Sequence, residues 1–393
     1  MLTKARHALA RHPRYLRMPD FLTPPGYEGA RWSARKLLNV YLSRWEEGRG
    51  RTKLRSYPFK LTVEATGACN LRCPACFTGV GDVGRPGSAM PLDLYRRVLA
   101  ELGDYLFELE FYNWGEPLLA KNIYTMIAEA SARGISTTVS TNFSFPFDAE
   151  RAERLVGSGL TVLGVSIDGA RQESYEQYRV GGKLDRVLAN CRLVADAKRR
   201  LGSKWPRLVW EFHVFAHNVA DVELAKTMAN ELGMELAVNK GWTVGAEWNP
   251  ESEYRFFWYP SPPTRCRFLW QQAVVNNDGG VAPCCGTFFR EDDVGHLAVH
   301  PGDLGAASFR EVWNGPKFQA ARGFYRARTG TDETRQLICF DCPLTKVWEK
   351  WQRHQEAGGT LAGFDPGYST NECFNYFWNR RPARAVSGAA PAS

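Results

Sequence analysis

The sequence predicts an α/β protein with a parallel β-sheet, followed by a smaller second domain. Between Pro58 and residue 240, strand-like and helix-like segments alternate about six times, and such alternation is typical of βα units around a parallel sheet. The 393 residues suffice for a barrel-sized core and a small second domain. No run of roughly 18 apolar residues occurs, so no membrane-spanning helix is expected.

The first 56 residues form a basic extension. They contain 13 Lys and Arg residues against 4 Asp and Glu, whereas the rest of the chain has 37 against 38. We interpret the extension as a solvated arm or a wrap over the bottom of the main domain, because no nucleic-acid motif accompanies its charge. An acidic partner, nucleic acid or a membrane surface is the less favoured contact. Residues 1–18 lack the apolar core and cleavage site of a secretory signal.

Two helices are expected in this extension, at residues 4–11 and 30–47. The breaker Thr23-Pro24-Pro25-Gly26 separates them. The second helix carries Trp32, Tyr41 and Trp45, from which we expect this helix to pack on the main domain.

The expected elements of the main domain follow in βα order. Strands are expected at residues 59–65, 107–112, 135–140, 160–167, 207–215 and 235–238, and helices at 91–102, 122–132, 149–156, 184–200 and 222–232. In β/α barrels the active site lies at the carboxyl ends of the strands. The loops after these strands are therefore the candidates for function.

Three cysteines lie within eight residues directly after the first expected strand. Cys69, Cys73 and Cys76 have the spacing Cys-x3-Cys-x2-Cys. A cubane iron-sulfur cluster takes one thiolate per iron, so three thiolates leave one iron open for another ligand. A zinc knuckle or buried thiols are the alternatives, but no Cys or His lies between Cys76 and Cys191 to complete a zinc site.

This cysteine loop resembles that of the radical S-adenosylmethionine (SAM) superfamily. The resemblance implies a partial (β/α)6 barrel in which SAM binds the open iron of a [4Fe-4S] cluster. It further implies reductive cleavage of SAM to a 5′-deoxyadenosyl radical that abstracts hydrogen from a substrate, with a reducing partner such as flavodoxin or ferredoxin. Ala75 stands where the family often has an aromatic residue that contacts the adenine.

The segment Asn113-Trp114-Gly115-Glu116-Pro117 follows the second expected strand and resembles the GGEP motif of the same family. In that motif, backbone polar groups receive the SAM amino group. Gly115 permits a close backbone approach, and Pro117 ends the strand. Trp114 replaces the first glycine of the motif, so the local backbone is expected to differ.

Residues 173–182 resemble the segment that supplies an arginine to the SAM carboxylate. Arg179 suits this role because a guanidinium can bind a carboxylate through two hydrogen bonds. Polar side chains at the ends of the third and fourth strands complete the set, although Asn142 or Asp168 could instead cap a helix. The resemblance implies these cofactor-binding residues: Asn113, Gly115, Glu116, Ser140, Asn142, Ser166, Asp168 and Arg179.

Five further cysteines lie in the second domain. Cys266 and Cys284 lie on either side of an expected hairpin, and Cys339 and Cys342 have the spacing Cys-x2-Cys. This arrangement is expected when separate loops converge on one four-thiolate site. The arrangement resembles the twitch domain, a shortened form of the SPASM extension, which implies one auxiliary [4Fe-4S] cluster. Structural zinc is the alternative. The implied ligands are Cys266, Cys284, Cys339 and Cys342, while the role of Cys285 stays open.

We predict five segments in the chain. These are a basic extension (1–56), a radical SAM partial barrel (57–240), a linker (241–263), a twitch or SPASM-like domain (264–345) and an aromatic-rich tail whose end is disordered (346–393). Cys191 is expected to be a core residue. Cys373 is either an inert thiol, a fifth ligand or a catalytic hydrogen donor to a substrate radical.

The predicted function is a radical SAM oxidoreductase that oxidises a carbohydrate, cyclitol or other small metabolite by two electrons through the auxiliary cluster. The first alternative is maturation of a ribosomally made peptide by cross-linking or epimerisation, and the second is a zinc-stabilised binding module. No leader-peptide recognition domain is evident, which favours a small molecule over a peptide. Seven cysteines in metal-like groups indicate a reducing compartment, so we expect a cytoplasmic enzyme. Because no nucleic-acid motif is present, we do not expect nucleic acid to be a partner.

Overall fold

A computed structural model gives the arrangement of most of the chain. It describes residues 28–81, 84–241, 248, 266–300, 303, 305, 308–327, 332–340, 342, 350 and 353–359. The helix expected at 4–11, most of the linker at 241–263 and Cys373 lie outside the described residues. Among the described residues, none of the helices has the length and apolar character needed to cross a membrane.

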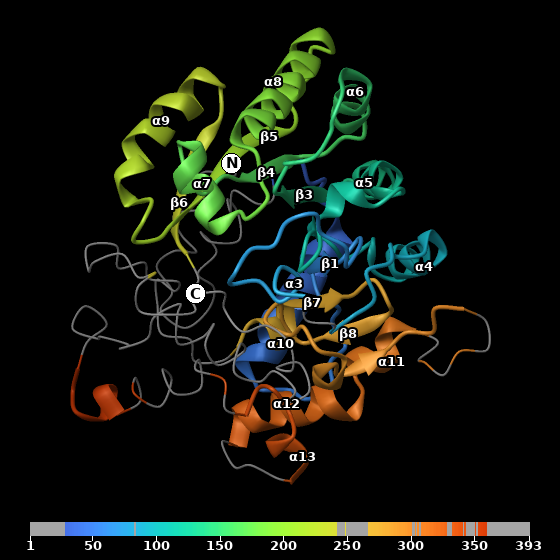
Figure 1. Cartoon of the computed structure of the whole chain (residues 1–393). Coiled ribbons are helices and arrows are strands. Elements are labelled where there is room, and N and C mark those ends of the chain that lie inside the picture. Colours follow the sequence, from blue (N-terminus) through green and yellow to red (C-terminus); the bar gives the residue numbers. More distant parts are fainter. Residues whose placement is uncertain are drawn as a thin grey trace, which may run out of the picture.

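One sheet organises the fold, with its strands in the order β6-β5-β4-β3-β2-β1-β7-β8-β9 (Figure 1). The first six strands are parallel to one another, which confirms the predicted parallel α/β architecture. Their bounds are β1 Lys60–Val63, β2 Glu108–Phe111, β3 Ser136–Thr141, β4 Val162–Ser166, β5 Arg207–Val214 and β6 Glu235–Lys240.

Helices connect these strands and cover one face of the sheet (Figure 1). Each begins and ends within two residues of its predicted position. A short helix after β4, α7 Gln172–Tyr178, was not predicted. The connecting helices are α4 Leu92–Leu102, α5 Ile123–Ala132, α6 Ala149–Gly157, α8 Leu184–Arg200 and α9 Val222–Glu231.

The two faces of the strands differ in chemistry. Leu61 and Val63 are fully buried and belong to the main hydrophobic core, together with apolar residues of the covering helices. Side chains alternate along a strand, so Lys60 and Thr62 lie on the opposite, inner face. There the Lys60 ammonium contacts the carboxylate of Glu110 at 2.7 Å. The inner face of the barrel is therefore polar.

The second cysteine-bearing module continues the same sheet. Strand β7 (Gln272–Val275) pairs in parallel with β1 from Lys60 to Val63, and β8 (Gly280–Ala282) and β9 (Gly295–His296) follow in antiparallel order. The sequence did not indicate this continuity. It brings the loops after β7 and β8 beside the loop after β1.

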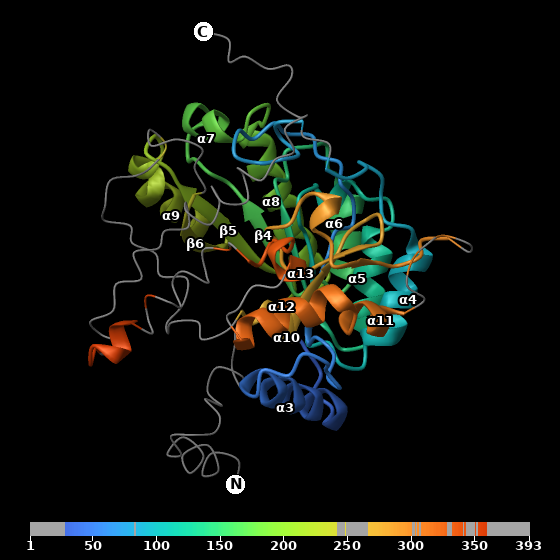
Figure 2. The same cartoon turned by 90° about the horizontal axis from the view of Figure 1, so that it is seen from below.

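Helix α3 (Ala34–Gly48) lies beside the short helix α10 (Phe268–Gln271) (Figure 2). The prediction that this helix packs on the main domain is confirmed, since Val40 is buried in a cluster with Phe59 and Phe107. Trp32 precedes the helix and meets the Phe107 ring edge-on, with ring centroids 5.2 Å apart. Tyr41 and Trp45 are more than 40% exposed, and the helix also packs through polar side chains. Its buried residues donate to or accept from neighbouring backbone, as in Ser43 Oγ to Trp270 O at 2.8 Å.

The remaining helices, α11 (Phe309–Trp313), α12 (Pro316–Ala327) and α13 (Asp332–Arg335), lie near α10 at one side of the sheet (Figure 2). Arg322 of α12 is fully buried. Its guanidinium donates to the carbonyl oxygens of Leu269, Thr52 and Trp313 at 2.7–2.9 Å. Through its hydrogen bond to Thr52, this side chain links the second module to the segment that precedes β1.

Candidate functional site

The predicted cysteine loop lies at the carboxyl end of β1. Burial raises the pKa of the Cys69 thiol to about 12 and that of Cys73 to about 11, and the nearby Cys76 contributes to both shifts. The loop is held by its own backbone, with the Cys76 N–H donating to the Cys73 carbonyl at 3.3 Å. The three thiols therefore gather in one place.

The chemistry of these side chains suits an iron-sulfur cluster, because each thiolate of a cubane cluster binds a different iron. The donor set fits the predicted three-thiolate cluster.

The segment resembling the GGEP motif lies against the entry to this loop. The Glu116 N–H donates to the Ala68 carbonyl at 2.8 Å, and a side chain at Gly115 would collide with the carbonyl of Thr66. The glycine is therefore required by this backbone contact, while its predicted role toward SAM stays a prediction. The Asn113 amide donates to Asn276 Oδ1 at 2.9 Å, which links the motif to the end of β7.

Glu116 has a positioning role in the structure. Its carboxylate accepts from Thr141 Oγ1 and from the Asn142 N–H, both at 2.7 Å. Asn142 is thereby held with its amide 3.6 Å from Cys69 Sγ. It lies beside the cluster loop and does not cap α6, whose N-cap is Asp148.

Ser140 and Ser166 converge on a carboxylate that sequence reasoning missed. Their hydroxyls donate to Glu211 Oε2 at 2.7 and 3.2 Å. Glu211 lies on β5, directly beside Ser166 in the register of β4 and β5. Gly164 is the one local signal, because any side chain there would touch the Glu211 carboxylate.

Arg179 reaches the cysteine loop from the end of α7. Its Nη1 lies 3.9 Å from Cys73 Sγ, and its Nε donates to Asp168 Oδ2 at 2.6 Å. Burial alone would raise the pKa of Asp168, but the charges of Arg179 and His213 lower it to about 2. His213, whose ring nitrogen lies 2.9 Å from the same carboxylate, was not predicted. The guanidinium is thus oriented beside the thiols.

We expect Arg179→Lys to weaken SAM binding about tenfold. The substitution keeps the positive charge but loses the planar fork that binds a carboxylate with two hydrogen bonds, and tenfold in Kd corresponds to ~1.4 kcal/mol. Equilibrium dialysis with labelled SAM measures the change. Arg171→Lys is the matched control, because that side chain is 57% exposed and pairs with Asp221. Equal affinity in wild type and Arg179→Lys would refute the role.

The cysteines of the second module also converge. Burial raises the pKa of the Cys284 thiol well above its usual value, and the other contributions come from Cys285, Cys339, Cys342 and Cys266. The other three predicted ligands, and also Cys285, therefore lie near Cys284. Cys284 lies just after β8, separated from it by Pro283, while Cys266 precedes α10. Thiols from separate segments thus lie near one cysteine, which is consistent with the predicted auxiliary cluster.

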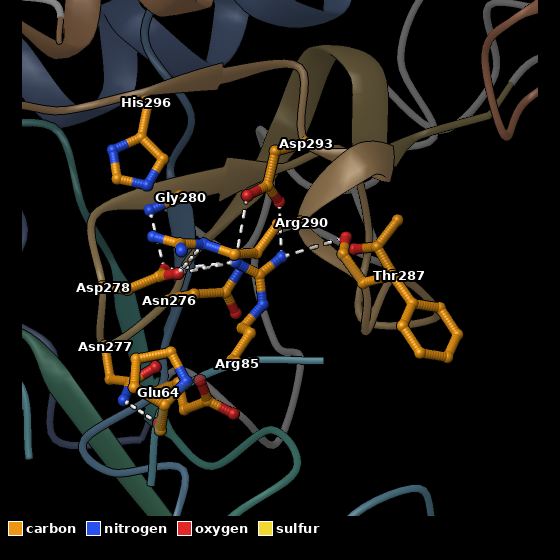
Figure 3. Close-up of polar contacts among 12 residues, drawn as sticks. Glu64, Arg85, Asn276, Asn277, Asp278, Gly280, Thr287, Arg290, Asp293 and His296 are labelled. Carbon is orange, nitrogen blue, oxygen red and sulfur yellow. Dashed lines mark hydrogen bonds and ion pairs between the residues drawn. The ribbon is translucent and has the colours of Figure 1, made fainter. Parts of the chain in front are cut away.

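A buried ion network lies between the module and the first cysteine loop (Figure 3). The guanidinium of Arg85 contacts Asp278 at 3.1 Å and Asp293 at 2.5 Å, and all three side chains are almost fully buried. Arg290 reaches Asp278 from the surface at 2.8 Å. Sequence reasoning missed this network because Arg85 is separated from its aspartate partners by 193 and 208 positions.

Glu64 directly follows β1 beside this network, with its side chain almost fully buried. Burial raises the pKa of its carboxyl to about 7, against the opposing effects of Arg85 and the N–H groups of Trp114 and Asn277. The folded state binds the carboxyl proton more tightly than the unfolded state does. This contribution to the free energy of unfolding is fully present below pH 4.5 and is lost as the pH rises through 7.

Glu64→Gln removes this titration. We expect the free energy of unfolding of the wild type, relative to the variant, to fall between about pH 4.5 and 8 by up to about 3 kcal/mol. Denaturant unfolding at several pH values measures the difference. Parallel pH profiles for the two proteins would show that Glu64 titrates normally.

Comparison with known proteins agrees with this geometry. Residues 63–228 match the sequence profile of the radical SAM superfamily, and residues 266–343 match the profile of the iron-sulfur cluster-binding domain named SPASM. The matched ranges contain the two cysteine groups. They favour iron-sulfur clusters over structural zinc at both sites, and they imply SAM as a cofactor.

Similar proteins share part of the chain. Fe-coproporphyrin III synthase of Methanosarcina barkeri is 28% identical over 129 residues, which are 32% of this chain and 32% of the synthase. PqqA peptide cyclase of Bradyrhizobium diazoefficiens is 26% identical over 162 residues, 41% of this chain and 39% of the cyclase. The matches thus span well under half the length of these relatives.

The fold is shared over a greater length. The crystal structure of Streptococcus suis SuiB bound to S-adenosylmethionine aligns with 89% of this chain and 84% of SuiB, with a TM-score of 0.56 and 15% identity. The similarity covers both the barrel and the C-terminal cysteine-bearing module, which confirms the predicted fold class.

Proposed function

Since the chain carries a radical SAM domain followed by a SPASM domain, we propose that it oxidises a polar small metabolite, a carbohydrate or cyclitol, by two electrons. A [4Fe-4S] cluster with SAM would supply a 5′-deoxyadenosyl radical that takes a hydrogen atom from a carbinol carbon of the substrate. Loss of the hydroxyl proton and of one electron to an auxiliary cluster would then leave the carbonyl product. We assign the first cluster to Cys69, Cys73 and Cys76. The second is assigned to four further cysteines, Cys266, Cys284, Cys339 and Cys342.

The chain's own residues orient the cofactor in this proposal. Arg179 binds the SAM carboxylate from its fixed position beside Cys73. Gly115 lets the backbone of the motif approach the SAM amino group. Ser166 and Asp168 face the same site from the end of β4. A flavodoxin or ferredoxin in the cytoplasm would provide the electron for cleavage.

The polar inner face of the barrel is the observation that favours a hydroxylated substrate. The Tyr112 hydroxyl donates to Glu110 at 2.6 Å. Glu211 accepts hydrogen bonds from two serine hydroxyls. Such a face offers many acceptors to the hydroxyl groups of a sugar or cyclitol, whereas an apolar substrate would leave them unpaired.

Peptide maturation is the second candidate. Among the similar proteins, one is named a PqqA peptide cyclase and another a mycofactocin maturase, and a further SuiB structure is described as bound to its precursor peptide. In this case the proposed radical would form on a peptide residue. Cys373 would then be a candidate hydrogen donor for epimerisation.

Transfer of deuterium tests the proposal. The anaerobically reconstituted protein is given SAM, dithionite and a pool of inositols and sugar alcohols deuterated at their carbinol carbons. We expect deuterium in 5′-deoxyadenosine and an equal amount of carbonyl product. If label enters 5′-deoxyadenosine only from deuterated peptides, the small-metabolite proposal is wrong and the peptide candidate replaces it.

A further inference from the structure

We infer that Trp114 is a positioning residue that couples the SAM-binding motif to the loop of the auxiliary cluster. Nothing in the family motif assigns this role, because the motif has a glycine where this chain has Trp114. The inference rests on the proposed function in one respect, namely that residues 113–116 contact SAM.

The backbone of Trp114 belongs to the first site. Its N–H donates to Glu64 Oε1 at 3.3 Å, and the next two residues, Gly115 and Glu116, lie against the carbonyls of Thr66 and Ala68. A ligand that binds the backbone of this motif therefore acts directly on the position of Trp114.

The side chain of Trp114 points to the other site. Its indole Nε1–H donates to the Thr287 carbonyl at 3.1 Å. Thr287 in turn donates to the Cys284 carbonyl, through its hydroxyl at 2.6 Å and its N–H at 3.3 Å. One residue thus separates Trp114 from a proposed ligand of the auxiliary cluster.

Three phenylalanines fix the indole in place. Phe77, Phe288 and Phe289 form an aromatic cluster with Trp114, which is only 9% exposed. Ring centroids are 4.9 Å apart for Phe77 and Trp114, 5.5 Å for Trp114 and Phe288, and 4.9 Å for the stacked pair Phe77 and Phe288. Because Cys76 packs against the same aromatic cluster, both cysteine loops adjoin it.

Arg85 makes a second contact with the loop that follows Cys284, closer to the end of that loop (Figure 3). It joins the end of the first cysteine loop to Asp293 and, through Nη2 at 3.4 Å, to the Phe289 carbonyl. At its C-terminal end, the loop from Cys284 to Asp293 is therefore held by the ion pair between Arg85 and Asp293. At its N-terminal end, which carries Cys284, it is held by the hydrogen bond from Trp114 to Thr287.

A shift of the Trp114 backbone moves its indole, and because protein interiors are close-packed, the residues in contact with the ring must move with it. When SAM restricts the motion of the motif backbone, the motion of Thr287 and Cys284 is therefore restricted as well. A glycine at this position has no side chain to make the link. This coupling makes the auxiliary site sensitive to whether SAM is bound.

Hydrogen exchange and electron paramagnetic resonance (EPR) test the coupling on the reconstituted protein. Amide exchange in residues 284–289 and the EPR spectrum of the reduced auxiliary cluster are measured with and without SAM, at saturating SAM for each variant. In the wild type we expect SAM to slow exchange several-fold and to shift the spectrum. Trp114→Gly should lose both effects, and Trp114→Phe, which keeps the ring but not the N–H donor, should retain part of them.

Trp45→Phe is the matched control, since that indole is 44% exposed on α3. It should respond to SAM as the wild type does. A full response in both Trp114 variants would overturn the inference, as would a wild-type protein that binds SAM without any change at residues 284–289. Absence of SAM binding in the wild type would be a different result, because it would refute the proposed function and this inference together.

Discussion

Replacing Cys69, Cys73 and Cys76 together with Ala is expected to abolish formation of 5′-deoxyadenosine. The three thiols gather at the end of β1, and without them no cluster can bind SAM and deliver the electron that cleaves it. Chromatography of anaerobic reactions with dithionite measures the product. We expect a loss to the background of the uncatalysed reaction, with the iron of the auxiliary site still present.

The matched control is Cys191→Ala. This thiol is 2% exposed and belongs to the main hydrophobic core on α8, so its loss changes packing only. SAM cleavage should persist in the control. Cleavage at the wild-type rate in the triple variant would show that the first cluster is held elsewhere.

Replacing Cys339 and Cys342 with Ala is expected to separate radical formation from oxidation. The variant should still produce 5′-deoxyadenosine from SAM, because the first cysteine loop is intact, but oxidised substrate should fall at least about tenfold. The physical reason is that the substrate radical then has no nearby electron acceptor. A single-turnover assay with deuterated substrate follows both products.

Cys285→Ala is the control for this second change. Cys285 lies near Cys284 but is outside the predicted set of four ligands, so the control should keep its auxiliary iron and its product yield. If the Cys339 and Cys342 variant has lost its auxiliary iron and still gives a normal yield, the auxiliary cluster does not accept the electron.

The sequence predicted the six parallel strands because each has its own apolar segment and a helix between it and the next. It also predicted which loops carry the cysteines, since the end of a strand is a local feature. Pairing of β7 with β1 could not be predicted, because Gln272–Val275 is a short strand whose partner is set by distant contacts. The position of the second module beside the first loop follows from that pairing.

Side-chain direction was the other limit. Helix α3 packs on the main domain as expected, but Tyr41 and Trp45 are exposed, and the adjoining surface presents backbone groups that bind Asn39, Ser43 and Glu46. Glu211 and Arg85 carry no local motif, and their partners come from other elements. Trp114 could be seen as a departure from the family motif, but its contact with Thr287 required the structure.

The central claim is that SAM binds directly to an open iron held by the first cysteine loop. Electron-nuclear double resonance on the reduced, reconstituted protein tests it, with SAM labelled with ¹⁵N in its amino group and ¹⁷O in its carboxylate. We predict hyperfine coupling of both labels to the cluster in the wild type and in the Cys339 and Cys342 variant. Bound SAM that shows no coupling to the cluster from either label would contradict the account.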